Sequence, residues 1–293
     1  MNIHATTADS VQRPFGLRRL TGSLGAEISG LDLSKPLAAP VLTALTQALV
    51  DHKVIFFRDQ PLTSEQHIAF GKQFGALEIH PFTEGSKSFA NDTKNQEIII
   101  VESTAETKSA ADIWHSDVSW RVDPSLGSIL KCSIAPAYGG DTMWADMEAA
   151  YAGLDDAMQS RLSDLVAVHD WHRFRANLRK QGVAEEKIAA LVESYPPVEH
   201  PVVRTHPVSK RKCIYVNAVF TIRIKGMAEK ESDDLLKDLY RLSTKPEYQV
   251  RFSWKKDSIA FWDNRSTQHY VVADFYPQHR RMERVTVAGD RPF

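Results

Sequence analysis

Two separated stretches of this chain carry side chains that can bind one metal ion. His115 and Asp117 are two residues apart, and in a strand or extended loop residues i and i+2 point to the same side. A chain with eleven histidines should contain roughly one such pair by chance, so the pair alone is weak evidence. The stretch from Ala260 to Tyr270 contains His269, which can supply a third ligand.

Together these residues predict a site of two imidazoles and one carboxylate. Such a set leaves coordination positions open, as in non-haem Fe(II) oxygenases, although a zinc hydrolase can use similar ligands. Arg280 and Arg284 have the same parity on an expected strand, so both guanidinium groups can face one cavity. Arginine is suited to binding a carboxylate through two N–H groups, and the pair therefore indicates anionic ligands.

The composition is that of an ordinary globular protein that binds small molecules. The chain has 293 residues, 43% of them hydrophobic and 25% charged, with a formal net charge of -1. This charge argues against a broad nucleic-acid or anionic-membrane surface, and no apolar run is long enough to span a bilayer. Cys132 and Cys213 are few and far apart, which suits a reducing compartment. We expect a cytoplasmic protein without nucleic-acid or membrane partners.

The elements that must position the site are mainly strands. Apolar runs predict strands at residues 53–57, 96–101, 128–134, 202–205, 213–217, 250–254, 258–262 and 284–288. Helical patterns occur at residues 40–51, after the capping-box pattern Thr63-x-x-Gln66, within 147–165 and around 235–242. This order predicts a mainly β fold with peripheral helices, an antiparallel double sheet of the jelly-roll type.

The chain predicts one catalytic domain. Residues 1–16 are expected to form an N-terminal tail and residues 17–293 the domain, with a charged helical insertion at about 170–198. The polar segments 79–95 and 103–112 are expected to form a wall and a lid beside the metal site, because long polar loops next to a rigid site commonly do so.

The sequence resembles the family of taurine and 2,4-dichlorophenoxyacetate dioxygenases over residues 17–293. The motifs are Trp114-His115-x-Asp117, Gly139-Gly140-Asp141-Thr142, His200-Pro201-Val202-Val203-Arg204-Thr205-His206-Pro207, Trp262-Asp263-Asn264-Arg265-x-Thr267-Gln268-His269 and the arginines after Gln278. Family members use Fe(II), 2-oxoglutarate and O2 on a double-stranded β-helix, and the resemblance implies the same here. Within the family the likeness is greatest to taurine dioxygenase.

The resemblance also implies roles for individual residues. His115, Asp117 and His269 would bind iron, and Thr142 and Arg280 would hold the distal carboxylate of 2-oxoglutarate. The implied substrate-binding residues are His80, Arg284, the amide of Val118, and the aromatic pocket residue Phe220.

The chain departs from the taurine dioxygenase pattern at two places. Ala111 replaces an asparagine near the substrate amine, and Phe174-Arg175 stand near a serine-phenylalanine pair. Recognition of the anion is therefore expected to persist better than recognition of an amine. From parity alone, Arg281 is an alternative to Arg280.

The expected function is hydroxylation of a small anion, either taurine or another alkylsulfonate, with release of sulfite and an aldehyde. An alkylsulfatase or an aryloxyalkanoate dioxygenase on the same scaffold is the alternative. A zinc hydrolase, which needs no partner for Arg280, and a binding protein without catalysis are the other classes considered. A homo-oligomer, dimer or tetramer, is expected because such assemblies are common among relatives.

Overall fold

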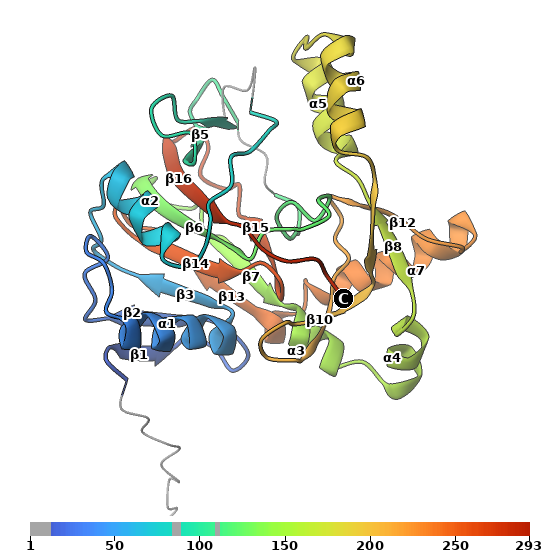
Figure 1. The fold of residues 1–293 in the computed structure, drawn as a ribbon, viewed down its shortest axis with the longest axis horizontal. Coiled ribbons are helices and arrows are strands. Elements are labelled where there is room, and N and C mark those ends of the chain that lie inside the picture. Colours follow the sequence, from blue (N-terminus) through green and yellow to red (C-terminus); the bar gives the residue numbers. More distant parts are fainter. Residues whose placement is uncertain (1–12, 84–88, 109–111) are drawn as a thin grey trace, which may run out of the picture.

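Two facing sheets form the centre of the structure (Figure 1), which is a computed structural model that describes residues 13–83, 89–108 and 112–293. The larger sheet has the order β1-β2-β3-β14-β6-β16-β5-β4, with bounds Gly16–Arg19, Ala26–Ser29, Val54–Phe57, Ile259–Asp263, Gly127–Ile134, Arg280–Val287, Ile99–Ser103 and Phe89–Asn91. The smaller sheet has the order β13-β7-β15, with bounds Gln249–Phe252, Thr142–Asp146 and Thr267–Val271. This architecture confirms the predicted mainly β jelly roll.

Two smaller sheets and seven described helices surround this centre. The sheet β12-β8-β9 consists of Thr221–Ile224, Val166–His169 and Val198–Pro201, and β10 pairs with β11 at Val203–Thr205 and Lys212–Ile214. Helices α1 to α7 are Ala39–His52, Ser64–Lys72, Met147–Ala152, Asp156–Leu162, His172–Lys180, Glu185–Ser194 and Glu229–Leu242, followed by the 3-10 helix η1 at Pro246–Tyr248. No helix in the described parts of the chain is long and apolar enough to cross a membrane.

Strand β3 shows why the large sheet tolerates uninterrupted apolar sequence. Val54 and Phe56 belong to the core between the two sheets, where the Phe56 ring stacks on Phe252 at a centroid distance of 4.1 Å. Ile55 and Phe57 point the other way, into the core that α1 and α2 cover. A strand buried on both faces has no need for alternating polar residues.

The capping box predicted at the start of α2 is confirmed. The hydroxyl of Thr63 accepts a hydrogen bond from the Gln66 amide, and the Gln66 side chain accepts one from the Thr63 amide. This reciprocal capping box satisfies two of the donors that the first turn of a helix leaves unpaired.

Several boundaries differ from the sequence predictions. Gly16 already belongs to β1, and residues 1–12 of the predicted tail lie outside the described residues. Strand β4 lies within the segment 79–95, which we expected to be a long polar loop. Part of the predicted lid, residues 109–111 with Ala111, also lies outside the described residues.

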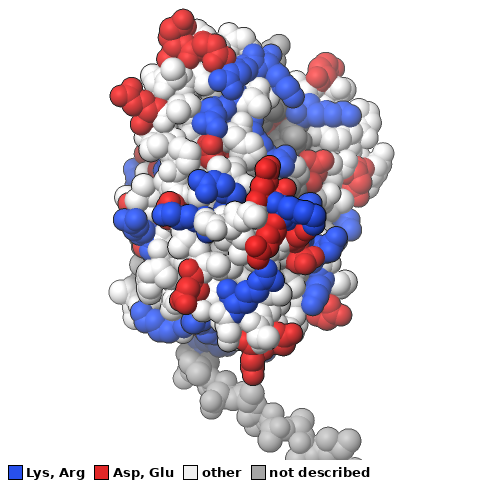
Figure 2. Space-filling view, turned by 90° about the vertical axis from the view of Figure 1, so that its right-hand side faces the viewer, with Lys and Arg blue, Asp and Glu red and all other residues white. Residues whose placement is uncertain are grey.

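Helices α5 and α6 occupy the expected helical insertion and lie side by side at the end of the molecule opposite α1 (Figure 1). Their buried residues Leu178 and Ile188 join an apolar cluster with Phe82, Trp120 and Phe220. The insertion therefore packs directly against the segment that follows Asp117. On the face drawn in Figure 2, acidic and basic side chains are interspersed.

Candidate active site

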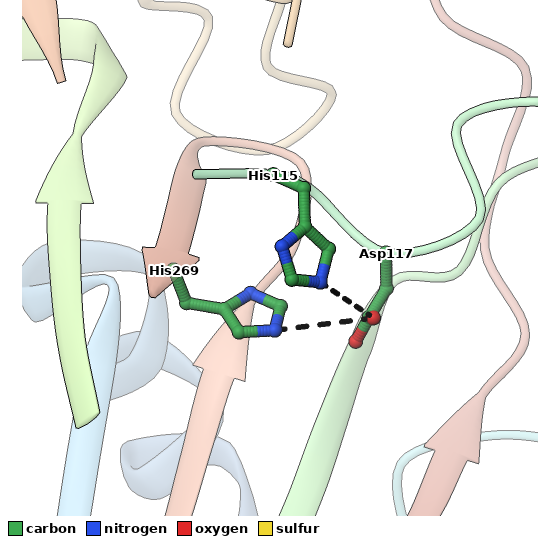
Figure 3. Close-up of side chains that lie close together, drawn as sticks. All are labelled: His115, Asp117 and His269. Atoms are coloured by element: carbon green, nitrogen blue, oxygen red, sulfur yellow. Dashed lines mark ion pairs between the residues drawn. The ribbon is translucent and has the colours of Figure 1, made fainter. Parts of the chain in front are cut away.

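The structure brings His115, Asp117 and His269 together (Figure 3), and one potential ligand atom from each lies within 4.8 Å of the others. The Nε2 atoms of His115 and His269 are 3.8 and 4.0 Å from Oδ1 of Asp117. Two imidazoles and one carboxylate that converge in this way form the facial set found in non-haem Fe(II) oxygenases.

Backbone pairing fixes the two histidines. His115 and His269 form an isolated antiparallel bridge, in which each amide donates to the other residue's carbonyl at 3.1 and 2.8 Å. The pairing joins the loop before Asp117 to β15 and places the two imidazole rings 4.2 Å apart. Residues separated by more than 150 positions thus become neighbours.

Asn264 fixes the carboxylate. Its side-chain oxygen accepts the Asp117 amide at 2.6 Å, and its side-chain nitrogen donates to the Asp117 carbonyl at 2.8 Å. Ser116 donates through its hydroxyl to the carbonyl of Thr267 at 2.7 Å. The turn between β14 and β15 therefore forms hydrogen bonds with the backbone on both sides of the Asp117 α-carbon. The sequence motif alone did not reveal this role of Asn264.

The protonation states of the histidines suit metal binding. The Ile113 carbonyl can only accept, so the 2.7 Å contact places the proton of His115 on Nδ1 and leaves a lone pair on Nε2. Burial lowers the pKa of His115, and burial together with His115 lowers the pKa of His269 to about 3. Both rings are neutral at physiological pH, as a ligand must be.

Asp117 is held as a carboxylate. Burial works to raise its pKa, but Arg284 and the two imidazoles outweigh burial and bring the pKa well below its usual range. Arg284 Nη1 lies 2.9 Å from Oδ1, and the Ser128 hydroxyl donates to Oδ2 at 3.0 Å. The donor set and its charge therefore fit a divalent metal ion.

A small cavity adjoins this cluster and contains most of the expected substrate residues. Its lining consists of Glu78, His80, Ile99, Asp117, Val118, Arg284 and Thr286. Phe220 lies outside that lining but close by, with its ring 6.4 Å from the His115 ring. Their roles in binding substrate remain predictions.

His80 and Val118 have unusual local states. Burial, followed by Arg284, lowers the pKa of His80 to about 3, and its Nδ1 accepts the Phe82 amide, so the ring proton is on Nε2. Val118 has φ 46°, a left-handed conformation that is uncommon for a β-branched residue. Strain of this kind persists where surrounding structure enforces it, and such places are often functional sites.

Phe174 of α5 reaches the same region, a role that the sequence left open. Its ring stacks on Phe220 at 6.0 Å with an interplanar angle of 5°, and it lies 5.9 Å from the His80 ring. Phe89 of β4 lies 5.0 Å from His80. Three segments far apart in the sequence thus form an aromatic wall beside the cavity.

Arg280 and Arg281 face opposite sides of β16. Arg281 forms an ion pair with Glu102 at 3.1 Å and is partly exposed, whereas Arg280 is 4% exposed and donates from Nε to the Gly140 carbonyl at 3.2 Å. Among the described residues no partner is recorded for Nη2 of Arg280. Burial lowers the Arg280 pKa to about 10, so the group stays charged at neutral pH.

A buried, charged and incompletely paired guanidinium fits a bound carboxylate. Gly140 has φ 69° and permits this arrangement, since a Cβ there would come within 3.1 Å of the Arg280 side chain. Thr142, two residues further on, begins β7 and accepts a hydrogen bond from Trp254 Nε1 at 2.9 Å. The residues present thus fit 2-oxoglutarate as well as the metal.

A jelly roll that places two imidazoles, one carboxylate and a buried arginine around a common interior defines a metal-dependent oxygenase. Comparison with known proteins identifies which kind. The sequence model of the family described as "Taurine catabolism dioxygenase TauD, TfdA family" matches residues 16–286. This chain belongs to that family.

Individual relatives cover most of the chain. An alkylsulfatase of Acinetobacter baylyi is 37% identical over 281 residues, which are 94% of this chain and 85% of the relative. An alpha-ketoglutarate-dependent sulfate ester dioxygenase of Pseudomonas putida is 35% identical over 277 residues, 93% of this chain and 89% of the relative.

A crystal structure of a taurine dioxygenase from Burkholderia xenovorans superimposes with a TM-score of 0.79 at 31% identity, covering 95% of this chain and 92% of the other. The protein is thus an oxidoreductase that depends on Fe(II), 2-oxoglutarate and O2, as the sequence predicted, and not a zinc hydrolase.

Proposed function

We propose that the enzyme hydroxylates the carbon next to a sulfonate or sulfate-ester group of a small organic anion. The observation that carries this proposal is the cavity in which Arg284, His80 and Val118 lie next to Asp117. Nη1 of Arg284 pairs with Asp117, but its buried Nε has no recorded partner among the described residues. An anion can pair with that N–H group, whereas a neutral analogue leaves it poorly satisfied, so neutral analogues should bind poorly.

His115, Asp117 and His269 would hold Fe(II), and Arg280 with Thr142 would hold the distal carboxylate of 2-oxoglutarate. When bound, the metal and the oxo acid supply the oxidising equivalent that converts a C–H bond to C–OH, with O2 as oxidant and succinate and CO2 as co-products. The protein's contribution is to place one C–H bond close to the metal and to exclude water.

The residues of the pocket orient the substrate. Arg284 offsets the charge of the anion, and the Nε2–H of neutral His80 is the proton available for a hydrogen bond to an oxyanion. No acceptor is recorded for the Val118 amide within the described parts of the chain, which suits a third contact. Phe174 and Phe220 offer apolar surface to the organic part.

The leaving group distinguishes the two candidate substrates. Hydroxylation next to a sulfonate gives an adduct that loses sulfite and leaves an aldehyde, whereas hydroxylation next to a sulfate ester oxygen releases sulfate and an aldehyde. The relatives from Acinetobacter baylyi and Pseudomonas putida favour the ester as a second candidate, because one is named an alkylsulfatase and the other a sulfate ester dioxygenase. An aryloxyalkanoate would present a carboxylate to the same residues.

The test compares taurine, hexanesulfonate, hexyl sulfate and hexanol, with assays for sulfite, sulfate and succinate. We expect product from at least one organosulfur anion, none from hexanol, and a loss of turnover of about tenfold or more in Arg284→Ala. Equal turnover of hexanol, or an Arg284→Ala enzyme as active as wild type, would contradict the anion pocket.

We further propose that the enzyme acts in the cytoplasm, that residues 17–293 form its single catalytic domain, and that it assembles as a dimer or tetramer. The described cysteines Cys132 and Cys213 are buried free thiols, which supports a reducing compartment. Light scattering of the purified chain tests the assembly, and a monomer would contradict it.

A further inference from the structure

A carboxylate stands in the wall of the proposed anion pocket. Glu78 lines the same cavity as His80, Asp117 and Arg284. Sites for negative ligands are ordinarily built from cations and hydrogen-bond donors, because an acid in the wall repels the ligand. Neither metal binding nor the anchoring of 2-oxoglutarate requires Glu78.

The backbone directs Glu78 toward Arg284. The Glu78 amide donates to the Thr286 carbonyl at 2.9 Å, so the segment before His80 lies along the end of β16. Arg284 and Thr286 are alternate residues of that strand and share one face, while Val285 between them packs into the outer core. All three cavity residues therefore meet on one side of the sheet.

Arg121 holds the carboxylate in this position. Its Nη1 lies 2.6 Å from Oε2 of Glu78, and both side chains are largely buried, at 18% and 11% exposure. The His200 Nε2 donates to the Arg121 carbonyl at 2.8 Å, which ties the backbone of Arg121 to β9. Burial raises the pKa of Glu78, and Arg121 works against that change.

The charged side chains in and beside the cavity form two ion pairs. Arg121 is paired with Glu78, and Nη1 of Arg284 is paired with Asp117. The buried Nε of Arg284 has no recorded partner among the described residues, so it is the donor that remains for a ligand. A monoanion bound to Arg284 is repelled only weakly by the Glu78 carboxylate. A second negative charge on the same group is repelled more strongly, because the two charges are close together in a poorly solvated space.

Building on the proposed function, we propose that Glu78, held by Arg121, restricts the pocket to singly charged oxyanions. A sulfonate or sulfate monoester is accepted, and a phosphate monoester of the same shape, which carries close to two charges above its second pKa of about 6, is rejected. Glu78 is a specificity-determining residue that acts by repulsion, a device that complements the attraction of Arg284.

Isothermal titration under argon tests this role without turnover. Hexyl sulfate and hexyl phosphate are titrated at pH 8 into protein loaded with Fe(II) and 2-oxoglutarate. We expect wild type to bind the sulfate at least about tenfold more tightly, and Glu78→Gln to bind the phosphate about tenfold better while sulfate affinity changes by less than about threefold. The glutamine keeps the size of the side chain and a hydrogen bond to Arg121.

Two further variants complete the experiment. Glu283→Gln removes an acid from the outer face of β16, where it pairs with Lys131 at 3.4 Å, and should leave the sulfate-to-phosphate ratio unchanged. Arg121→Met leaves Glu78 unpaired, so it should weaken the binding of both hexyl sulfate and hexyl phosphate, and that of the phosphate more. If Glu78→Gln does not fold, Arg121→Met replaces it as the test.

The failure of each proposal gives a different result. If wild type binds hexyl sulfate and Glu78→Gln leaves the sulfate-to-phosphate affinity ratio unchanged, the role of Glu78 is overturned. The proposed function is then still intact. Wild type that binds neither anion would overturn the anionic substrate class and this role with it.

Discussion

At the scale of single residues, the burial of Arg280 favours it over Arg281 as the proposed anchor of 2-oxoglutarate. Parity on a strand left Arg281 as an alternative, because a bulge or a shifted boundary reverses which residue points inward. The pairing of β16 with β6 does shift between Arg281 and Met282, yet Arg280 is the buried residue and Arg281 the one that pairs with Glu102.

Arg280→Ala should weaken 2-oxoglutarate binding by about 1.5–3 kcal/mol, because a charge-assisted bond to the distal carboxylate is lost. Arg281→Ala is the matched control and should change the affinity little. The measurement is the dissociation constant for 2-oxoglutarate under argon with Fe(II) present. A large effect of Arg281→Ala with none of Arg280→Ala would reverse the assignment.

At the scale of elements, the turn between β14 and β15 positions two of the proposed metal ligands, Asp117 and His269, as a unit. It carries Asn264, which contacts the amide and carbonyl of Asp117, and it leads directly into the strand that holds His269. Replacing a residue that orients a metal ligand typically lowers the metal affinity of the site by about 10- to 100-fold.

Asn264→Ala should lower the affinity for Fe(II) by about 10- to 100-fold, since the Asp117 backbone loses the two hydrogen bonds that the Asn264 side chain makes with it. The free energy of unfolding should fall by about 1–3 kcal/mol because the Asp117 amide is left unpaired. Iron retained after gel filtration, compared with Asp117→Ala as the variant without the carboxylate, measures the first effect. Wild-type iron affinity in a destabilised Asn264→Ala protein would mean that the residue stabilises the fold only.

The same element shows why part of the site escaped sequence reasoning. Apolar runs such as Val54–Phe57 predict strands buried on both faces. Strand β15 contains Gln268 and His269, and its sequence is too polar to be distinguished from that of a loop. The motif of residues 262–269 did contain His269, which the structure brings next to His115 and Asp117. The roles of Glu78 and Phe174 depend on contacts between distant segments, which spacing within one segment cannot reveal.

At the scale of the whole molecule, buried neutral histidines occur well beyond the metal site. His67, His80 and His200 have pKa values of about 4, 3 and 4, and burial is the first cause in each case. In an unfolded chain a histidine titrates near 6.5, so as pH falls the unfolded state binds protons that the folded state does not. These groups therefore remove stability as pH drops from about 6.5 toward 4.

His67 is suited to a test because it lies in α2, remote from the proposed ligands, and its Nε2 donates to the Ile129 carbonyl at 3.1 Å. Between pH 7 and pH 5 it should account for a loss of about 2 kcal/mol in the free energy of unfolding. Urea unfolding of metal-free wild type and His67→Gln at both values measures this, and we expect the smaller loss in the variant. Equal losses would show that another group is responsible.

The attachment of α5 and α6 has a consequence for engineering. The strands on either side of the helix pair, β8 and β9, are antiparallel neighbours with His169 opposite Val198. The segment that contains both helices therefore begins and ends at adjacent points of the sheet. Phe174, in this helical segment, contributes to the aromatic wall, whereas His115, Asp117 and His269 lie outside the segment. Helix pairs grafted from relatives onto this hairpin should change which organic group is tolerated while the iron chemistry is retained.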